Sequence, residues 1–136
     1  MKVDQFLGMW KLDPDQSRYE LGEPPERASY LLQGDDERLV FQVNYDLGGL
    51  QMTLTYLAQP DGLLHDYDDV NGIVDRLMTS VVDAKTLVTT SWSQGTEIAH
   101  ASRVLSDDGL AMTISQSGFG ADGESFCNLS VYRKVQ

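Results

Sequence analysis

Cysteine is nearly absent from this chain of 136 residues, which contains only Cys127. A single cysteine cannot form a disulfide within the chain, so the sequence indicates a protein of a reducing compartment. No run of residues approaches the ~20 consecutive apolar positions that a membrane-spanning helix needs, and the first residues lack the apolar segment of a secretory signal peptide. We therefore expect a cytoplasmic protein that does not insert into membranes.

Positive charge is also scarce. The chain has 10 Lys and Arg residues against 21 Asp and Glu residues, a net charge of −11. Such a balance argues against nucleic acid or an anionic membrane as partner, because both would be repelled. It identifies no substrate and leaves the oligomeric state open, since a charge excess of this size is common on soluble surfaces.

Residue types that carry metals or catalysis are few. The two histidines, His65 and His100, and the single cysteine lack the spacing of a zinc site. The segment 66–77 begins like a calcium loop, but Val70 and Leu77 occupy positions where such a loop needs oxygen ligands. There is no phosphate-binding loop and no nucleophile elbow. The sequence therefore predicts no metal, no cofactor and no catalytic residue.

What the chain has in abundance is short strands and tight turns. Turn signals such as Asn71-Gly72 and Asp108-Gly109 recur every ten to fourteen residues. They separate ten expected strands: 5–12, 27–33, 37–46, 49–59, 63–69, 74–82, 85–92, 95–106, 110–117 and 124–135. Sequential hairpins favour an all-β, up-and-down antiparallel sheet in a single domain, 1–136, and closing it into a barrel removes the exposed edges. A two-sheet sandwich is the alternative.

Alternation within the strands shows which face is apolar. The inner sets are Leu39, Phe41, Val43 and Tyr45, then Leu50, Met52, Leu54 and Tyr56, then Leu110, Met112 and Ile114. These side chains suit either a packed core or an apolar cavity. A closed barrel of ~8 or more strands has interior room for one small ligand.

The first expected strand carries a Gly-x-Trp pair, Gly8 and Trp10. Alternation puts both on one face, where glycine permits close approach and an inward tryptophan plugs the narrow end of a barrel. We expect a cation of the last strand, Arg133 or Lys134, against the ring. The barrel-closing set is thus Gly8, Trp10 and Arg133 or Lys134. In a sandwich, Trp10 would merely be a buried aromatic.

The segment Phe6-Leu7-Gly8-Met9-Trp10-Lys11-Leu12 resembles the opening of the intracellular fatty-acid-binding proteins. The likeness returns in the second half, in residues that follow the family's order: Leu87-Val88, Trp92, Gly95-Thr96-Glu97, Arg103, Asp108-Gly109 and Cys127 to Lys134. It covers both ends of the chain and is thin from about residue 20 to 85. It indicates the calycin superfamily, which includes the lipocalins, and implies a closed barrel holding an apolar molecule.

Two departures from the family stand out. Its members carry a helical lid between the first two strands, whereas segment 13–27 here is short and broken by prolines such as Pro14. We expect the lid to be absent or reduced, with an extended loop in its place. The arginine of the family's final Arg-x-Tyr pair corresponds to Ser130, so the remaining anchor for a ligand carboxylate is Arg103 with Tyr132.

Arg103 and His100 have opposite parity on one expected strand, so without a bulge only one of them faces the interior. The resemblance favours Arg103, although periodicity alone would leave it outside and solvated. An inward arginine needs an anion, a carboxylate or ordered water. The predicted ligand-binding residues are Arg103, Tyr132, Ser130, Phe41, Leu54, Tyr56 and Met112.

Three functions remain open at this point. The first is binding or carriage of a small apolar or amphiphilic, and in some cases anionic, molecule in the barrel. The second is an enzyme or isomerase on the same barrel, using an interior His100 or Tyr132, although no motif supports catalysis. The third is an interaction protein whose barrel is filled by side chains.

Overall fold

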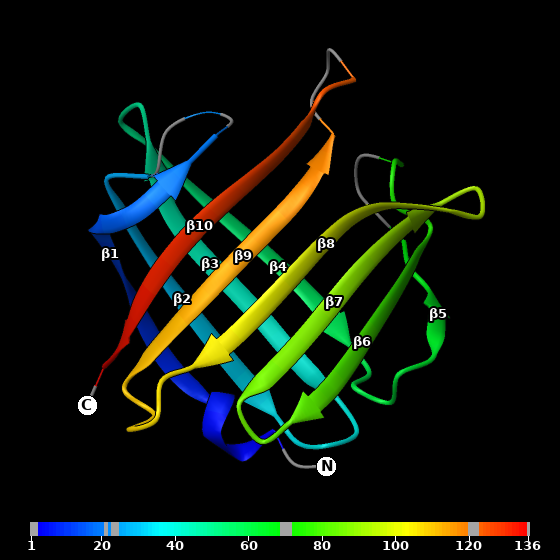
Figure 1. The fold of residues 1–136 in the computed structure, drawn as a ribbon, viewed down its shortest axis with the longest axis horizontal. Helices are drawn as coiled ribbons and strands as arrows, with labels where there is room; N and C mark the ends of the chain where they lie inside the picture. Colours follow the sequence, from blue (N-terminus) through cyan, green and yellow to red (C-terminus); the bar gives the residue numbers. More distant parts are fainter. Residues whose placement is uncertain (1–2, 21, 23–24, 69–71, 120–122, 136) are drawn as a thin grey trace.

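The computed structural model describes residues 3–20, 22, 25–68, 72–119 and 123–135. It contains a short 3₁₀ helix, η1, and ten strands (Figure 1). The elements are η1 (Asp4–Phe6), β1 (Gly8–Tyr19), β2 (Arg27–Gly34), β3 (Leu39–Leu47), β4 (Leu50–Ala58), β5 (Leu64–Asp66), β6 (Arg76–Asp83), β7 (Thr86–Ser93), β8 (Thr96–Leu105), β9 (Ala111–Phe119) and β10 (Ser125–Lys134).

All ten strands belong to one antiparallel sheet, in the order β4-β3-β2-β1-β10-β9-β8-β7-β6-β5. The sheet curls on itself, as Figure 1 shows, and β4 comes close to β6 across the remaining gap. The prediction of ten up-and-down antiparallel strands is confirmed. Hydrogen bonding joins β1 to β10, but within the described residues no ladder joins the end strands β4 and β5.

The first strand differs most from the expectation. It was predicted over 5–12 with a loop after it, whereas β1 continues to Tyr19 and pairs with β10 on both sides of an irregularity between Asp13 and Arg18. Pro14 lies inside that irregularity, where no ladder hydrogen bond is needed, so it does not end the strand. No helix occurs among the described residues of segment 13–27, and across the described chain no helix is long and apolar enough to cross a membrane.

The packed core lies at the end of the sheet that holds η1, which we name the closed end (Figure 1). Trp10 is fully buried there, and its indole N–H donates a 3.0 Å hydrogen bond to the carbonyl oxygen of Phe6. This bond ties η1 to β1. The other fully buried apolar side chains are Val3, Phe6, Leu32, Leu39, Phe41, Leu87 and Met112.

Strand β4 departs from the predicted pattern of burial. Its apolar residues Leu50, Met52 and Leu54 were expected to be half-buried, but all three are exposed. The reason is topological: β4 is an end strand, so only β3 covers it through the ladder. Alternation predicted the direction of these side chains without revealing that the sheet ends beside them.

Candidate ligand-binding site

A cavity of about 500 Å³ lies inside the curled sheet. All six tyrosines of the chain line it, together with one arginine, and among the described lining residues none is an aspartate or glutamate. The wall consists of Tyr19, Pro25, Ala28, Tyr30, Val43, Tyr45, Leu54, Tyr56, Tyr67, Val74, Leu77, Thr89, Ser91, Ala99, His100, Ala101, Arg103, Ile114, Gln116, Ser130 and Tyr132. In a protein of net charge −11, the described residues of this interior carry no negative charge.

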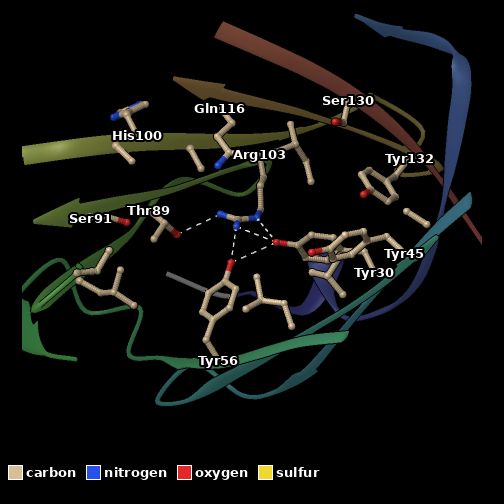
Figure 2. Close-up of a pocket in the computed structure, with 18 of the residues that line it drawn as sticks. Tyr30, Tyr45, Tyr56, Thr89, Ser91, His100, Arg103, Gln116, Ser130 and Tyr132 are labelled. Atoms are coloured by element: carbon tan, nitrogen blue, oxygen red, sulfur yellow. Dashed lines mark hydrogen bonds between the residues drawn. The ribbon is translucent and has the colours of Figure 1, made fainter. Parts of the chain in front are cut away.

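Arg103 is the buried cation of this wall, with 3% of its surface exposed. Its Nε and Nη2 atoms donate hydrogen bonds of 3.2 and 2.8 Å to the Tyr30 hydroxyl. Nη2 also donates to Tyr56 over 2.8 Å, and Nη1 to the Thr89 hydroxyl over 3.0 Å (Figure 2). Every acceptor is therefore an uncharged hydroxyl group.

Two aromatic rings pack against the Arg103 guanidinium. The Cζ atom of Arg103 lies 4.8 Å from the centroid of Phe41 and 5.7 Å from that of Tyr30. Phe41 in turn stacks on Tyr56, with centroids 4.6 Å apart and planes 5° from parallel. The stacked pair fixes both the guanidinium and the Tyr56 hydroxyl, which gives the cluster little freedom to rearrange.

Two of the tyrosine hydroxyls near Arg103 have raised pKa values. Burial raises the pKa of Tyr56 well above its ordinary value, and burial with the neighbouring Tyr19 and Tyr30 does the same for the pKa of Tyr132. Burial alone would lower the pKa of Arg103, but the surrounding tyrosine oxygens outweigh it and raise that pKa. Arg103 is thus a permanent cation without an anionic partner in the described wall, an arrangement that is costly until an anion arrives.

The cluster also has more donors than acceptors. Arg103 donates to the hydroxyls of Tyr30, Tyr56 and Thr89, so each must direct its own proton elsewhere. The Tyr30 and Tyr56 oxygens are 3.3 Å apart, which accounts for one of those protons. Within the described residues, one tyrosine O–H, the Thr89 O–H and one N–H of Nη1 lack an acceptor. Such a set is suited to a group that only accepts, such as a carboxylate.

The last strand contributes two further polar groups. Ser130 is buried, and its Oγ lies 2.9 Å from the hydroxyl oxygen of Tyr19. Tyr132 is buried with its ring edge-on to Tyr30 at 5.5 Å between centroids. Both residues line the cavity.

The apolar residues predicted for the site divide into two groups. Leu54 and Tyr56 line the cavity, and because Leu54 is 51% exposed the wall reaches the surface at β4. Phe41 and Met112 were expected on the wall, but they lie in the packed core and are not among the residues that line the cavity. Phe41 acts on the site through Arg103, which it supports.

His100 lies on the other side of β8 from Arg103. It is exposed, and Figure 2 shows its ring directed away from the guanidinium, although it borders the edge of the cavity. The burial pattern along β8 shows why Arg103 and not His100 faces the interior. Arg103 and Leu105 are buried, while Val104 between them is exposed. From Ala99 to Leu105, the odd-numbered positions of this strand face inward.

At the closed end the cation beside Trp10 is Lys134, whose Nζ lies 4.8 Å from the ring centroid. Including Arg133 in the closure was therefore wrong. Arg133 is exposed and forms a 3.4 Å ion pair with Asp13 instead. The physical reason is strand parity, since Lys134 pairs directly with Trp10 across the β1–β10 ladder while Arg133 pairs with Lys11.

Sequence reasoning missed several residues of the wall. They are Tyr19, Tyr30, Tyr45, Tyr67 and Thr89. A usable signal was present for Tyr45, which shares the inward parity of β3 with apolar neighbours. A concentration of every tyrosine on one face of the sheet is not expected for a core filled only by packing.

Among the described residues no group of three or more His, Cys, Asp or Glu side chains could hold a metal ion.

Comparison with solved structures identifies the fold. Zebrafish ileal bile acid-binding protein in complex with cholic acid matches with a TM-score of 0.61 at 15% identity, over 96% of this chain and 99% of that one. Apo lipid binding protein 8 of Caenorhabditis elegans matches with a TM-score of 0.63 at 9% identity, over 97% of each chain. No protein-family model and no curated protein sequence matches. The chain therefore shares the fold of these two proteins, which is the fatty-acid-binding-protein-like fold that its sequence resemblance implied.

Proposed function

We propose that this protein binds a small amphiphilic molecule in its cavity, with an anionic group at Arg103 and an apolar body along the rest of the wall. One observation carries the proposal: Arg103 is buried, permanently charged and bonded only to neutral hydroxyls. A carboxylate or a similar acceptor would neutralise the charge and take up the unused O–H and N–H donors. The described residues of the wall include no carboxylate, which supports a ligand as the source of the anion.

The remainder of the wall supports an apolar body for that ligand. Aliphatic side chains such as Leu77 and Ile114 line the cavity together with the tyrosines. A volume of about 500 Å³ lies within the range of small-molecule sites. The two similar structures agree with this chemistry, since one holds cholic acid and the other is described as a lipid binding protein.

The same observations bear on the two alternative functions, an interaction protein with a filled barrel and an enzyme. A cavity of this size supports ligand binding over a barrel filled by side chains. An enzyme built on an interior histidine has no support in the described residues, because His100 is exposed. A cytoplasmic location stays a prediction.

The direct test is to identify what the protein carries. Native mass spectrometry of the protein purified from its host, followed by solvent extraction, is expected to reveal one bound molecule that ionises as an anion and has an apolar body. Delipidated protein should then bind the extracted compound again with one-to-one stoichiometry. Recovery of only neutral or cationic compounds, or failure of the delipidated protein to bind any amphiphilic acid, would contradict the proposal.

A further inference from the structure

The irregularity in β1 is a large bulge opposite a single residue of β10. Asp13 pairs with Val131, and the next pair is Arg18 with Leu129, so residues 14–17 face Ser130 alone. Ser17 closes the bulge, because its hydroxyl donates a 2.9 Å bond to the carbonyl of Asp13 and accepts a 3.1 Å bond from the amide of Val131.

The bulge reverses the inward parity of the strand. Before it, the even-numbered Trp10 and Leu12 are buried, and after it the odd-numbered Ser17 and Tyr19 are the partly buried positions. A regular strand would have sent Tyr19 outward, as it does Met9, which is exposed. Bulges commonly redirect a side chain next to a binding site, and this one directs Tyr19 into the cavity.

Tyr19 and Ser130 then form a hydroxyl pair on the wall, 2.9 Å apart. The strand is held in place beyond them, since the amide of Cys127 donates to the Glu20 carboxylate and the amide of Glu20 to the Asn128 side chain. Whichever hydroxyl donates within the pair, the other keeps a proton, and both oxygens keep lone pairs. The pair can therefore both donate to and accept from a neutral polar group.

We propose that the Tyr19–Ser130 pair is a second, uncharged anchor, and that the ligand carries a hydroxyl or keto group in addition to its acid. The inference rests on the proposed function, because it assigns the second end of the same ligand. Its basis is the division of charge on the wall: Arg103 supplies the cation, while Tyr19 and Ser130 supply neutral donors and acceptors on β1 and β10. A second carboxylate would gain little there, since among the described residues of the wall the only permanent cation is Arg103.

The test compares hexadecanoic acid with its positional series of monohydroxy derivatives by titration calorimetry. At least one isomer is expected to bind the wild-type protein about 3- to 10-fold more tightly than the parent acid, the gain of one neutral hydrogen bond. Tyr19→Phe and Ser130→Ala should each abolish most of that gain, measured as the ratio of the affinities for the hydroxy acid and the parent acid in the same variant. Arg103→Leu should weaken both acids by the same factor and keep their ratio.

Tyr45→Phe is the matched control, because it removes a phenol hydroxyl from the same wall without touching the pair. It should leave the gain intact. The proposal is overturned, with the proposed function still standing, when hexadecanoic acid binds but no hydroxy isomer binds better, or when the gain survives in both Tyr19→Phe and Ser130→Ala. If none of the acids binds the wild-type protein, the proposed function and this inference fall together.

Discussion

The ammonium group of Lys134 lies over the ring of Trp10 at the closed end of the sheet. The Nζ atom of Lys134 lies 4.8 Å from the Trp10 ring centroid and donates a 2.6 Å hydrogen bond to the carbonyl oxygen of Leu7. Because Trp10 itself bonds to the carbonyl of Phe6, the two side chains together hold the chain that enters β1. The closure thus combines ring burial, a cation–π contact and two hydrogen bonds to the backbone.

Replacing Trp10 by alanine is expected to lower the free energy of unfolding by ~3–5 kcal/mol, because it empties a fully buried site. Urea unfolding of the wild type and the variant measures the change. Trp92→Ala is the control, since Trp92 is only partly buried, and it should cost clearly less. Equal losses for the two tryptophans would contradict a special role of Trp10 in closure.

Gly8→Ala tests why glycine stands two residues before Trp10. Gly8 has φ of +115°, and an added Cβ would lie 3.1 Å from Lys134 Nζ. The strained backbone is expected to cost roughly 1–3 kcal/mol, measured by the same unfolding experiment. Gly95→Ala provides the comparison, since its φ of +82° is also positive but nothing lies near its Cβ. If Gly8→Ala costs no more than Gly95→Ala, the contact with Lys134 is unimportant.

Much of the fold was predictable because turns and strand parity are local properties. Asp108-Gly109 separates two strands where expected, and most strand boundaries agree within two residues. The predicted turn at Asn71-Gly72 begins outside the described residues. The continuation of β1 past Pro14 was not predictable, because the bulge that accommodates the proline depends on its pairing with β10. The alternation of residues before the bulge therefore could not predict which side of the sheet Tyr19 faces.

The site was predictable in part. Arg103, Ser130 and Tyr132 were named from a resemblance, and Leu54 and Tyr56 from strand alternation. The hydrogen-bonded cage that Tyr56 forms with Tyr30 and Thr89 around the guanidinium was not predicted. Assigning that cage needs the positions of three strands distant in the sequence. The curvature of the sheet, which separates the packed Phe41 from the cavity, is likewise a tertiary property that no single strand encodes.

The buried tyrosines predict how stability depends on pH. Unfolded tyrosine ionises near pH ~10, whereas burial raises the pKa of Tyr56 and Tyr132 in the folded protein. Above about pH 10 the unfolded state thus holds fewer protons than the folded state, so the free energy of unfolding falls as pH rises. At lower pH both states hold these protons, and the two tyrosines do not change the slope of stability with pH. Urea unfolding from about pH 8 to 11 measures the slope.

The Tyr56→Phe and Tyr132→Phe variants should each reduce that slope. Absorbance of tyrosinate should also show that a part of the tyrosines resists ionisation until the protein unfolds. Ionisation of all six near pH ~10 in protein that remains folded would contradict the burial of these hydroxyls.

Arg103→Leu tests the energetic cost of the buried cation in the ligand-free protein. Because Arg103 lacks an anionic partner among the described residues, its replacement should leave the free energy of unfolding unchanged or raise it, by at most about 1–4 kcal/mol. Arg133→Leu makes the same chemical change at an exposed position and should have an effect within about 1 kcal/mol. A loss of more than about 2 kcal/mol in Arg103→Leu alone would mean that the hydroxyl cage already compensates the charge.

The most direct test of an anion site at Arg103 is the affinity of a paired acid and alcohol, dodecanoic acid and dodecanol, for the wild type and for Arg103→Leu. Removal of the guanidinium should weaken binding of the acid by roughly 1.5–3 kcal/mol, the value of one lost charged hydrogen bond, and should change binding of the alcohol little. Equal losses for acid and alcohol, or no loss for either, would contradict the assignment of Arg103 as the anchor of an anionic ligand.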